Sequence, residues 1–251
     1  MSRGPSRIFP RTVSRETLDI LAPSDPRALR SRRDLQRVNR FLGTRRIIER
    51  GMQPAMGRST PGLRLRVLEL GAGDGSLMLR IAQDLSKWWP AAHVTLLDRL
   101  ALLSAETSAA FARLGWSVEM LSVDVLDWAA APVPPRRAPR WDVIVANLFL
   151  HHFDELLLPG LLSAIEARCD LFVACEPRRT FVSLIGSHLV GALGASRVTR
   201  EDAVLSVRAG FRDAELSGMW RADSDEWQLQ EHATGLFSHF FSAARRPSAS
   251  G

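Results

Sequence analysis

Apolar runs of strand length alternate with amphipathic stretches along most of this chain of 251 residues. The segments between the apolar runs place their own apolar residues at helical spacing. We expect strands at 64–70, 93–98, 117–124, 141–147 and 170–177, and helices at 75–89, 99–115 and 154–169. This alternation predicts an α/β fold with a doubly wound, mostly parallel sheet.

The last third of the chain follows a different order, in which two helices precede two late strands. We expect the helices at 181–193 and 200–209, and the strands near 212–220 and 236–244. A proline-rich surface loop is expected at 131–140, between the third and fourth strands of the sheet.

The N-terminal segment has a helical pattern after residue 15, broken at two prolines and at Gly43. Between residues 33 and 42, three apolar residues share one helical face and three arginines share the other. We interpret this segment as a lid that packs on the main domain; a surface for an anionic substrate or a membrane is the alternative. The chain then divides into a flexible basic arm at 1–15, a helical lid and linker at 16–60, a main domain at 61–246 and a tail at 247–251.

Composition and charge narrow the classes of protein to consider. With 46% hydrophobic residues the chain can bury a core, and no apolar run reaches the roughly 18 residues of a membrane span. No secretory signal is visible, and two cysteines cannot form a disulfide framework or a zinc site, so a cytoplasmic location is expected. The net charge is +6, but the first fifty residues hold 13 arginines against 5 acids. The basicity therefore belongs to that segment, whereas a nucleic-acid enzyme more often spreads cations around its catalytic face.

The stretch VLELGAGDGSL, from Val67 to Leu77, places three glycines between an apolar run and a helical pattern. Such turns at the carboxyl end of a strand commonly hold a cofactor. A P-loop is excluded because no Gly-Lys-Ser/Thr follows, and the dinucleotide fingerprint fails because Ser76 stands where its third glycine belongs. Two acids, Glu69 and Asp74, would repel a pyrophosphate and favour a cationic ligand.

These residues carry a resemblance to a known family. VLELGAGDGSL resembles motif I of the class I S-adenosylmethionine-dependent methyltransferases, and the segments LLD, SVDVLDW and WDVIVANLFLHHF match its later motifs in order and spacing. The resemblance implies a seven-stranded, Rossmann-like methyltransferase fold and S-adenosylmethionine as the cofactor. It implies that Asp98 binds the ribose hydroxyls, Asp124 the adenine amino group, and Asn147 the methionine moiety. The implied cofactor-binding residues are Glu69, Gly71, Ala72, Gly73, Gly75, Asp98, Arg99, Asp124, Val125, Asn147 and Leu148.

Two histidines follow the fourth expected strand, and a hydroxyl acceptor needs a base to take its proton. We therefore consider His151 and His152 as catalytic candidates, with His152 slightly preferred; a helix cap or core packing is the alternative for each. Glu176 and Arg178, after the fifth strand, are weaker candidates for substrate contact, and a bond to nearby backbone is the alternative for Glu176. The acidic metal cluster of catechol methyltransferases is not matched, so no metal is expected.

Within that family the chain is similar to small-molecule methyltransferases of the ubiquinone/menaquinone and natural-product type. This implies a small apolar aromatic, polyketide-like or quinol acceptor, with O-methylation slightly preferred over C-methylation. One alternative is an RNA or ribosomal RNA methyltransferase that uses the basic N-terminal segment. Another is a non-catalytic, cofactor-binding partner subunit. No DNA partner is expected, and a peripheral membrane contact through the basic N-terminal helix stays open.

Overall fold

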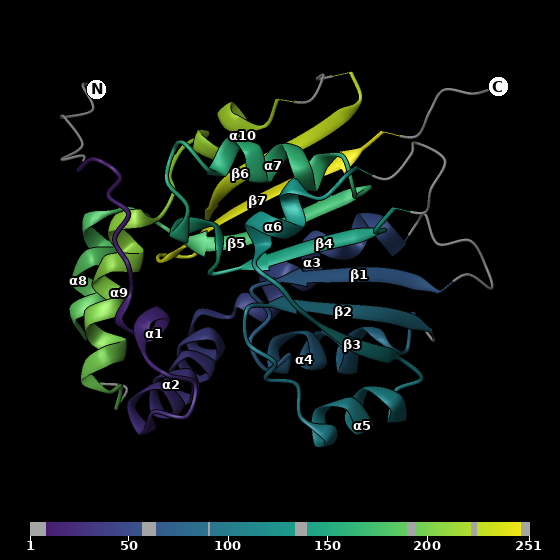
Figure 1. The fold of residues 1–251 in the computed structure, drawn as a ribbon. Helices are drawn as coiled ribbons and strands as arrows, with labels where there is room; N and C mark the ends of the chain where they lie inside the picture. Colours follow the sequence, from purple (N-terminus) through teal and green to yellow (C-terminus); the bar gives the residue numbers. More distant parts are fainter. Residues whose placement is uncertain are drawn as a thin grey trace.

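The computed structural model describes residues 9–56, 64–89, 91–133, 140–189, 194–221 and 225–246. Their centre is a seven-stranded sheet with the strand order β3-β2-β1-β4-β5-β7-β6 (Figure 1). The strands are β1 Leu65–Leu70, β2 Ala92–Asp98, β3 Ser117–Ser122, β4 Val143–Asn147, β5 Leu171–Pro177, β6 Trp227–Thr234 and β7 Ser238–Arg245. The first five strands are parallel to one another, and β7 runs antiparallel to both of its neighbours. The expected mostly parallel sheet is confirmed.

The strand order reverses at the centre of the sheet, because β1 has β2 on one side and β4 on the other. In an open α/β sheet, the connections after two such strands leave in opposite directions and open a crevice beyond their carboxyl ends. The glycine loop follows β1, and the two histidines follow β4. The topology therefore brings both sequence-predicted groups to one edge of the sheet.

Helices cover both faces of the sheet, so the central strands are buried along nearly their whole length while successive residues point to opposite faces. On β1, Val67 belongs to one apolar cluster, together with α3 Thr44–Met56, α4 Ser76–Leu85 and α5 Ala105–Arg113. The next residue, Leu68, belongs to the opposite cluster, together with α6 Val125–Ala130, α7 Leu158–Glu166 and α10 Glu215–Met219. Ile48 and Met52 of α3 are fully buried, so this helix forms part of the core of the main domain.

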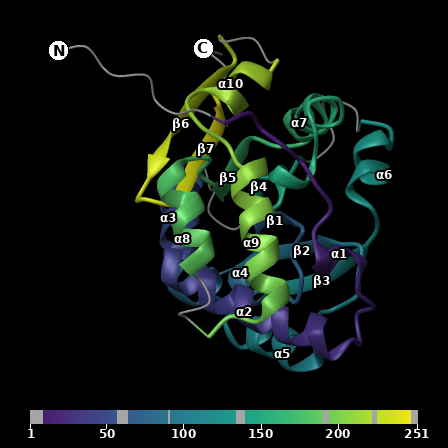
Figure 2. The same cartoon turned by 90° about the vertical axis from the view of Figure 1, so that its left-hand side faces the viewer.

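A third group of helices stands beyond the carboxyl ends of the strands (Figure 2). It consists of α1 Thr17–Ile20, α2 Pro26–Leu42, α8 Phe181–Leu189 and α9 Arg197–Ala209. The helix α2 begins at Pro26 after the capping side chain of Asp25, and it ends at Gly43, which has a φ of 67°. The break expected at Pro26 is therefore the start of α2, and the break expected at Gly43 is its end.

Buried carboxylates join the N-terminal helices to α9. Asp34 of α2 accepts hydrogen bonds from Ser196 N at 2.7 Å and from Thr199 Oγ1 at 3.0 Å. Asp202 of α9 accepts hydrogen bonds from the backbone N–H groups of Thr17 and Leu18, at 2.7 and 3.0 Å. Upstream, Arg11 donates to the carbonyl oxygens of Ala209 and Phe153. Residues 9–34 are thus tied to the domain by hydrogen bonds as well as by packing.

The structure corrects one expected strand near the C-terminus. Residues 212–220 contain the short helix α10, and the strand before β7 is β6, which the sequence pattern did not indicate. The reason is a tertiary contact: Glu231 of β6 accepts hydrogen bonds from Leu216 N and Ser217 N in the first turn of α10. A side chain fifteen residues away therefore caps this helix.

Several expected segments lie partly outside the described residues: the arm at 1–8, the linker at 57–62, most of the proline-rich loop, the end of the 181–193 helix, and the tail. Within the described ranges, no helix is long and apolar enough to cross a membrane.

Candidate functional site

A cavity of about 1050 Å³ lies between the sheet edge and the third group of helices. Its wall includes ten of the eleven expected cofactor-binding residues, all but Gly75, and it includes both histidines. Glu176 and Arg178 do not line it. We call the part around Glu69, residues 71–76, Asp98 and Asp124 the glycine-loop end. The part around Glu16, Asp19, His151 and His152 is the histidine end.

The glycine loop takes a backbone shape that side chains would prevent. Gly71, Gly73 and Gly75 all have positive φ, from 57° to 73°. A Cβ on Gly71 would lie 2.2 Å from Phe149 Cδ2, and one on Gly75 would lie 2.5 Å from Leu96 Cδ1. The loop backbone therefore passes close to Phe149 at Gly71 and close to Leu96 at Gly75, and Gly71 and Gly73 line the cavity.

Two carboxylates that follow strands, Asp98 and Asp124, accept hydrogen bonds from backbone N–H groups at this end of the cavity. Asp98 accepts hydrogen bonds from Gly73 N at 2.9 Å and from Leu100 N at 3.0 Å, so it joins the loop to the end of β2. Asp124 caps α6 by accepting a hydrogen bond from Leu126 N at 2.8 Å. These backbone bonds fix the direction of both carboxylates, and both line the cavity.

Glu69 is the unusual acid of the glycine-loop end. It is 3% exposed, and its Oε2 is buried without a hydrogen-bond partner in the described structure. Burial, followed by the charges of Asp74 and Asp98, raises the pKa of Glu69 to about 8. Glu69, Asp74 and Asp98 act on one another, and among the described residues no cation lowers the pKa of Glu69. A ligand with a positive charge would fit this group of acids.

The end of β4 contributes a polar group and a strained residue. Asn147 Oδ1 is buried without a partner, while its Nδ2 lies 3.5 Å from Asn39 Oδ1 of α2. Leu148 has a φ of 50°, which is uncommon for a residue with a branched side chain, and its N–H donates to the carbonyl of Cys175. This turn directs both residues to the cavity wall.

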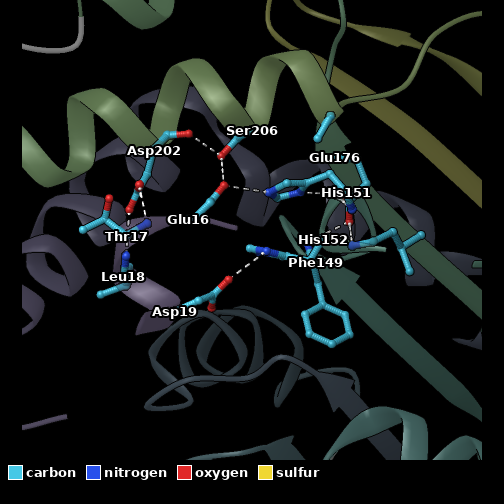
Figure 3. A network of polar contacts seen from close by, with 12 residues as sticks. Glu16, Thr17, Leu18, Asp19, Phe149, His151, His152, Glu176, Asp202 and Ser206 are labelled. Carbon is cyan, nitrogen blue, oxygen red and sulfur yellow. Dashed lines mark hydrogen bonds and ion pairs between the residues drawn. The ribbon is translucent and has the colours of Figure 1, made fainter. Parts of the chain in front are cut away.

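His151 is buried between two carboxylates (Figure 3). Its Nδ1 lies 2.8 Å from Glu176 Oε2, and its Nε2 lies 3.4 Å from Glu16 Oε1. Burial alone would lower the pKa of His151, but the hydrogen bonds and charges of Glu16 and Glu176 raise it to about 9. These contacts favour the imidazolium form of His151: Nδ1 bonds to Glu176, and Nε2 lies at ion-pair distance from Glu16.

Glu176 is fully buried and supports the turn that carries the histidines. Besides His151, it accepts hydrogen bonds from Phe149 N at 3.0 Å and Leu150 N at 2.9 Å. The backbone bond considered as its alternative role is present. The backbone N–H of Arg178 donates to the carbonyl of Phe237, and Arg178 itself does not line the cavity.

His152 also meets a carboxylate from the N-terminal segment. Its Nδ1 lies 3.3 Å from Asp19 Oδ2, and Asp19 Oδ1 accepts a hydrogen bond from Arg99 at 3.2 Å. Burial raises the pKa of Asp19, but the contacts with His152 and Arg99 outweigh burial, and the net direction is downward. Asp19 is therefore an anion in contact with both His152 and Arg99.

Sequence reasoning missed Glu16 and Asp19. Glu16 is held by His151 and by Ser206 of α9, whose hydroxyl donates to it. Each acid lies more than 130 positions from its histidine in the sequence. No local pattern could pair residues at that separation, and only the expected lid placed the segment near the cavity.

The histidine end also contains a group that could hold a metal ion. Among the described residues, Glu16, His151 and His152 bring three ligand atoms within 4.8 Å of one another. The two imidazole rings are nearly stacked, however, with centroids 4.4 Å apart and planes 31° apart. The same atoms make ion pairs, His151 with Glu16 and His152 with Asp19.

Comparison with known proteins gives a fold. No protein-family model and no curated protein matches this sequence. Among solved structures, the plantazolicin methyltransferase BpumL in complex with SAH matches with a TM-score of 0.60 and 14% identity, over 89% of this chain and 92% of that chain. Magnesium protoporphyrin IX methyltransferase (ChlM) from Synechocystis PCC 6803 with bound SAH matches with a TM-score of 0.51 and 15% identity, over 82% of this chain and 84% of that chain. At such identities the likeness shows the fold, so the expected Rossmann-like methyltransferase fold is confirmed.

Proposed function

We propose that this chain is an S-adenosylmethionine-dependent methyltransferase for a small, largely apolar acceptor. The observation that carries the proposal is Glu69, a buried acid with an unpartnered oxygen beside a glycine loop at the switch point of this fold. S-adenosylmethionine bears an ammonium and a sulfonium and has no phosphate. A cationic ligand of that kind supplies the charge that this group of acids lacks.

The residues of the glycine-loop end fit this cofactor. The open space at Gly73 leaves room for close approach, and Asp98 and Asp124 keep fixed carboxylates on the cavity wall. We assign Asp98 to the ribose hydroxyls, Asp124 and Val125 to the adenine, and Asn147 and Leu148 to the methionine moiety. The unpartnered Asn147 Oδ1 supports that last assignment. When bound, the cofactor supplies an electrophilic methyl group.

The rest of the cavity supports an apolar acceptor. Beyond the cofactor-binding residues, its wall includes apolar residues of the N-terminal segment and of the segment after β4: Leu18, Leu21, Leu35, Val38, Phe41, Leu42, Phe153 and Leu157. Residues 18–42 supply the first six of these, so the N-terminal helices form part of the acceptor wall. We propose that residues 16–42 are the lid of the site, which excludes water from the methyl transfer.

We assign the general base to His152. Glu16 and Glu176 raise the pKa of His151 to about 9, which favours its protonated form, so it is a poor proton acceptor at neutral pH. His152 lines the cavity, and its Nε2 makes no hydrogen bond to the described part of the chain. A base at this place supports O-methylation of a phenol or quinol. We propose that the enzyme is of the ubiquinone/menaquinone and natural-product type, which its sequence resembles.

The test is a binding experiment. Calorimetry with S-adenosylmethionine should give a dissociation constant near 1 μM, about −8 kcal/mol, with little dependence on salt, and NAD should not bind. Glu69→Ala should weaken this binding at least about tenfold, while the exposed Glu106→Ala should not. Absence of S-adenosylmethionine binding would overturn the proposal. RNA binding that falls steeply with salt would instead favour an RNA methyltransferase that uses the arginines of α2.

A further inference from the structure

We infer that Asp19 of the N-terminal segment is a positioning residue that fixes the tautomer of His152, so that the lid completes the base. This inference rests on the proposed function, because it assigns a role within the same site. It goes beyond a covering role for the N-terminal helices, since a cover contributes no group to the chemistry.

The first step is the pair of contacts on the Asp19 carboxylate. Oδ2 faces His152 Nδ1 at 3.3 Å (Figure 3), and Oδ1 accepts from the Arg99 guanidinium at 3.2 Å. An anion can only accept, so a neutral His152 facing it carries its proton on Nδ1. The lone pair is then on Nε2, the nitrogen that no described residue binds. This is the arrangement by which an aspartate orients a catalytic histidine.

The second step is that neighbouring rings restrict the imidazole of His152. The His151 ring lies against it at 4.4 Å between centroids, and the Phe149 ring lies at 6.3 Å. His151 is itself held at both nitrogens by Glu16 and Glu176. Its ring therefore provides a fixed surface against which His152 rests. Asp19 then needs to fix only the tautomer of His152, that is, which of its two nitrogens carries the proton.

The third step is that Asp19 reaches His152 only when the N-terminal segment is docked. The helix α1 has four residues, too few to be stable alone. Its first amides are capped by Asp202 at 2.7 and 3.0 Å, and Glu16 just before it contacts His151 and Ser206. These contacts flank Asp19 in the sequence, so docking and the placement of Asp19 are one event.

The proton balance of the reaction follows. The acceptor O–H bond breaks and its proton passes to His152 Nε2. The acceptor oxygen uses its electron pair to form the bond to the methyl carbon, and the electrons of the broken carbon–sulfur bond stay on sulfur. His152 becomes an imidazolium, with protons on both nitrogens, and Asp19 opposes that new charge at Nδ1.

Asp19→Asn tests this directly because the two partners of Asp19 make different demands. The asparagine oxygen remains with Arg99, since a guanidinium offers only donors, and the amide NH₂ then faces His152. An NH₂ group binds the lone pair of Nδ1, so it stabilises the opposite tautomer. Asp25→Asn is the matched control, because Asp25 is an aspartate of the same segment that caps α2 and pairs with Arg27 far from the histidines.

The measurement is the ¹⁵N shift pair of the His152 ring in the full chain at about pH 8, above the ordinary titration range of imidazole, assigned with His152→Asn. The wild type and Asp25→Asn should show the Nδ1–H form, and Asp19→Asn should show mainly Nε2–H. Asp19→Glu should restore Nδ1–H, which separates this role from a loss of fold. An unchanged tautomer in Asp19→Asn, or an Nε2–H wild type, would overturn the inference. Calorimetry with S-adenosylhomocysteine tests the proposed function separately, since failure to bind leaves the tautomer result standing.

Discussion

At the glycine-loop end, backbone turns and strand ends place four carboxylates, each within a few residues of the element that orients it: Glu69, Asp74, Asp98 and Asp124. At the histidine end, two side chains after β4 meet three carboxylates, Glu16 and Asp19 from the N-terminal segment and Glu176 from β5. The first end depends on backbone conformation, and the second depends on pairs of opposite charges. The two ends should therefore fail in different ways when one residue is changed.

Glu176→Gln should have the largest effect, and it should act on stability. The change leaves the buried His151 imidazolium with one carboxylate fewer and turns an amide NH₂ toward donors. Breaking a buried ion pair costs about 3–5 kcal/mol, so the unfolding free energy from urea titration should fall by that order. Glu201→Gln is the matched control, because it breaks an exposed pair with Arg197 and should leave the unfolding free energy nearly unchanged. A loss below about 1 kcal/mol for Glu176→Gln would show that the histidine end does not depend on charge.

Gly71→Ala should come next, and Gly73→Ala gives its control within the same loop. Both positions have positive φ, which costs an alanine about 1–2 kcal/mol. Only at Gly71 does the added Cβ also meet a side chain, Phe149, at 2.2 Å, whereas nothing lies within 4 Å at Gly73. Overpacking adds about 1–3 kcal/mol, so thermal or urea unfolding should separate the two variants by about that amount. Equal losses would mean that the ring of Phe149 yields freely.

Asp98→Ala should mainly weaken cofactor binding. It removes a carboxylate that orients the loop through Gly73 N and that we assign to the ribose. The expected loss is about 1–3 kcal/mol in the calorimetric binding free energy of S-adenosylhomocysteine. Asp127→Ala, an exposed aspartate of α6 outside the cavity wall, should leave the affinity unchanged. Equal affinity for Asp98→Ala and wild type would remove the ribose assignment.

The difference between the two ends also explains how far the sequence could lead. The glycine-loop end was predictable because parallel strands bring their carboxyl ends to one edge, and each of the five predicted parallel strands ended within a few residues of its observed end. The positions of Asp98, Asp124 and Asn147 at that edge followed from that rule. A resemblance in four motifs then implied the cofactor.

The histidine end was only half predictable, for a physical reason. His151 and His152 are adjacent and chemically identical, so the sequence could not tell which one would be charged. Burial between Glu16 and Glu176 decides this, and that information lies in contacts between distant segments. The misassigned strand at 212–220 has the same origin, because Glu231 of β6 supplies the cap of α10. Local sequence patterns carry no information on side-chain contacts between segments that lie far apart in the chain, so these contacts could not be predicted.

Glu69, the buried acid of the glycine-loop end, should make the stability of the protein depend on pH. The ordinary pKa of a glutamic acid is 4.5, and burial beside Asp74 and Asp98 raises that of Glu69 to about 8. Between these values the folded chain holds a proton that the unfolded chain has lost. The stability that this proton gives is present below pH 4.5 and is lost as the pH rises through about 8.

A bound cation reverses this preference, because it favours the carboxylate. Binding of S-adenosylmethionine below about pH 8 should therefore release close to one proton, and its affinity should rise by up to about tenfold per pH unit toward that value. Calorimetry in buffers of different ionisation enthalpy measures the proton directly. Glu69→Gln should abolish the release, while the exposed Glu106→Gln should keep it. If the wild type releases no proton, Glu69 is already ionised in the free protein, and the glycine-loop end then carries a fixed negative charge rather than one that forms with its ligand.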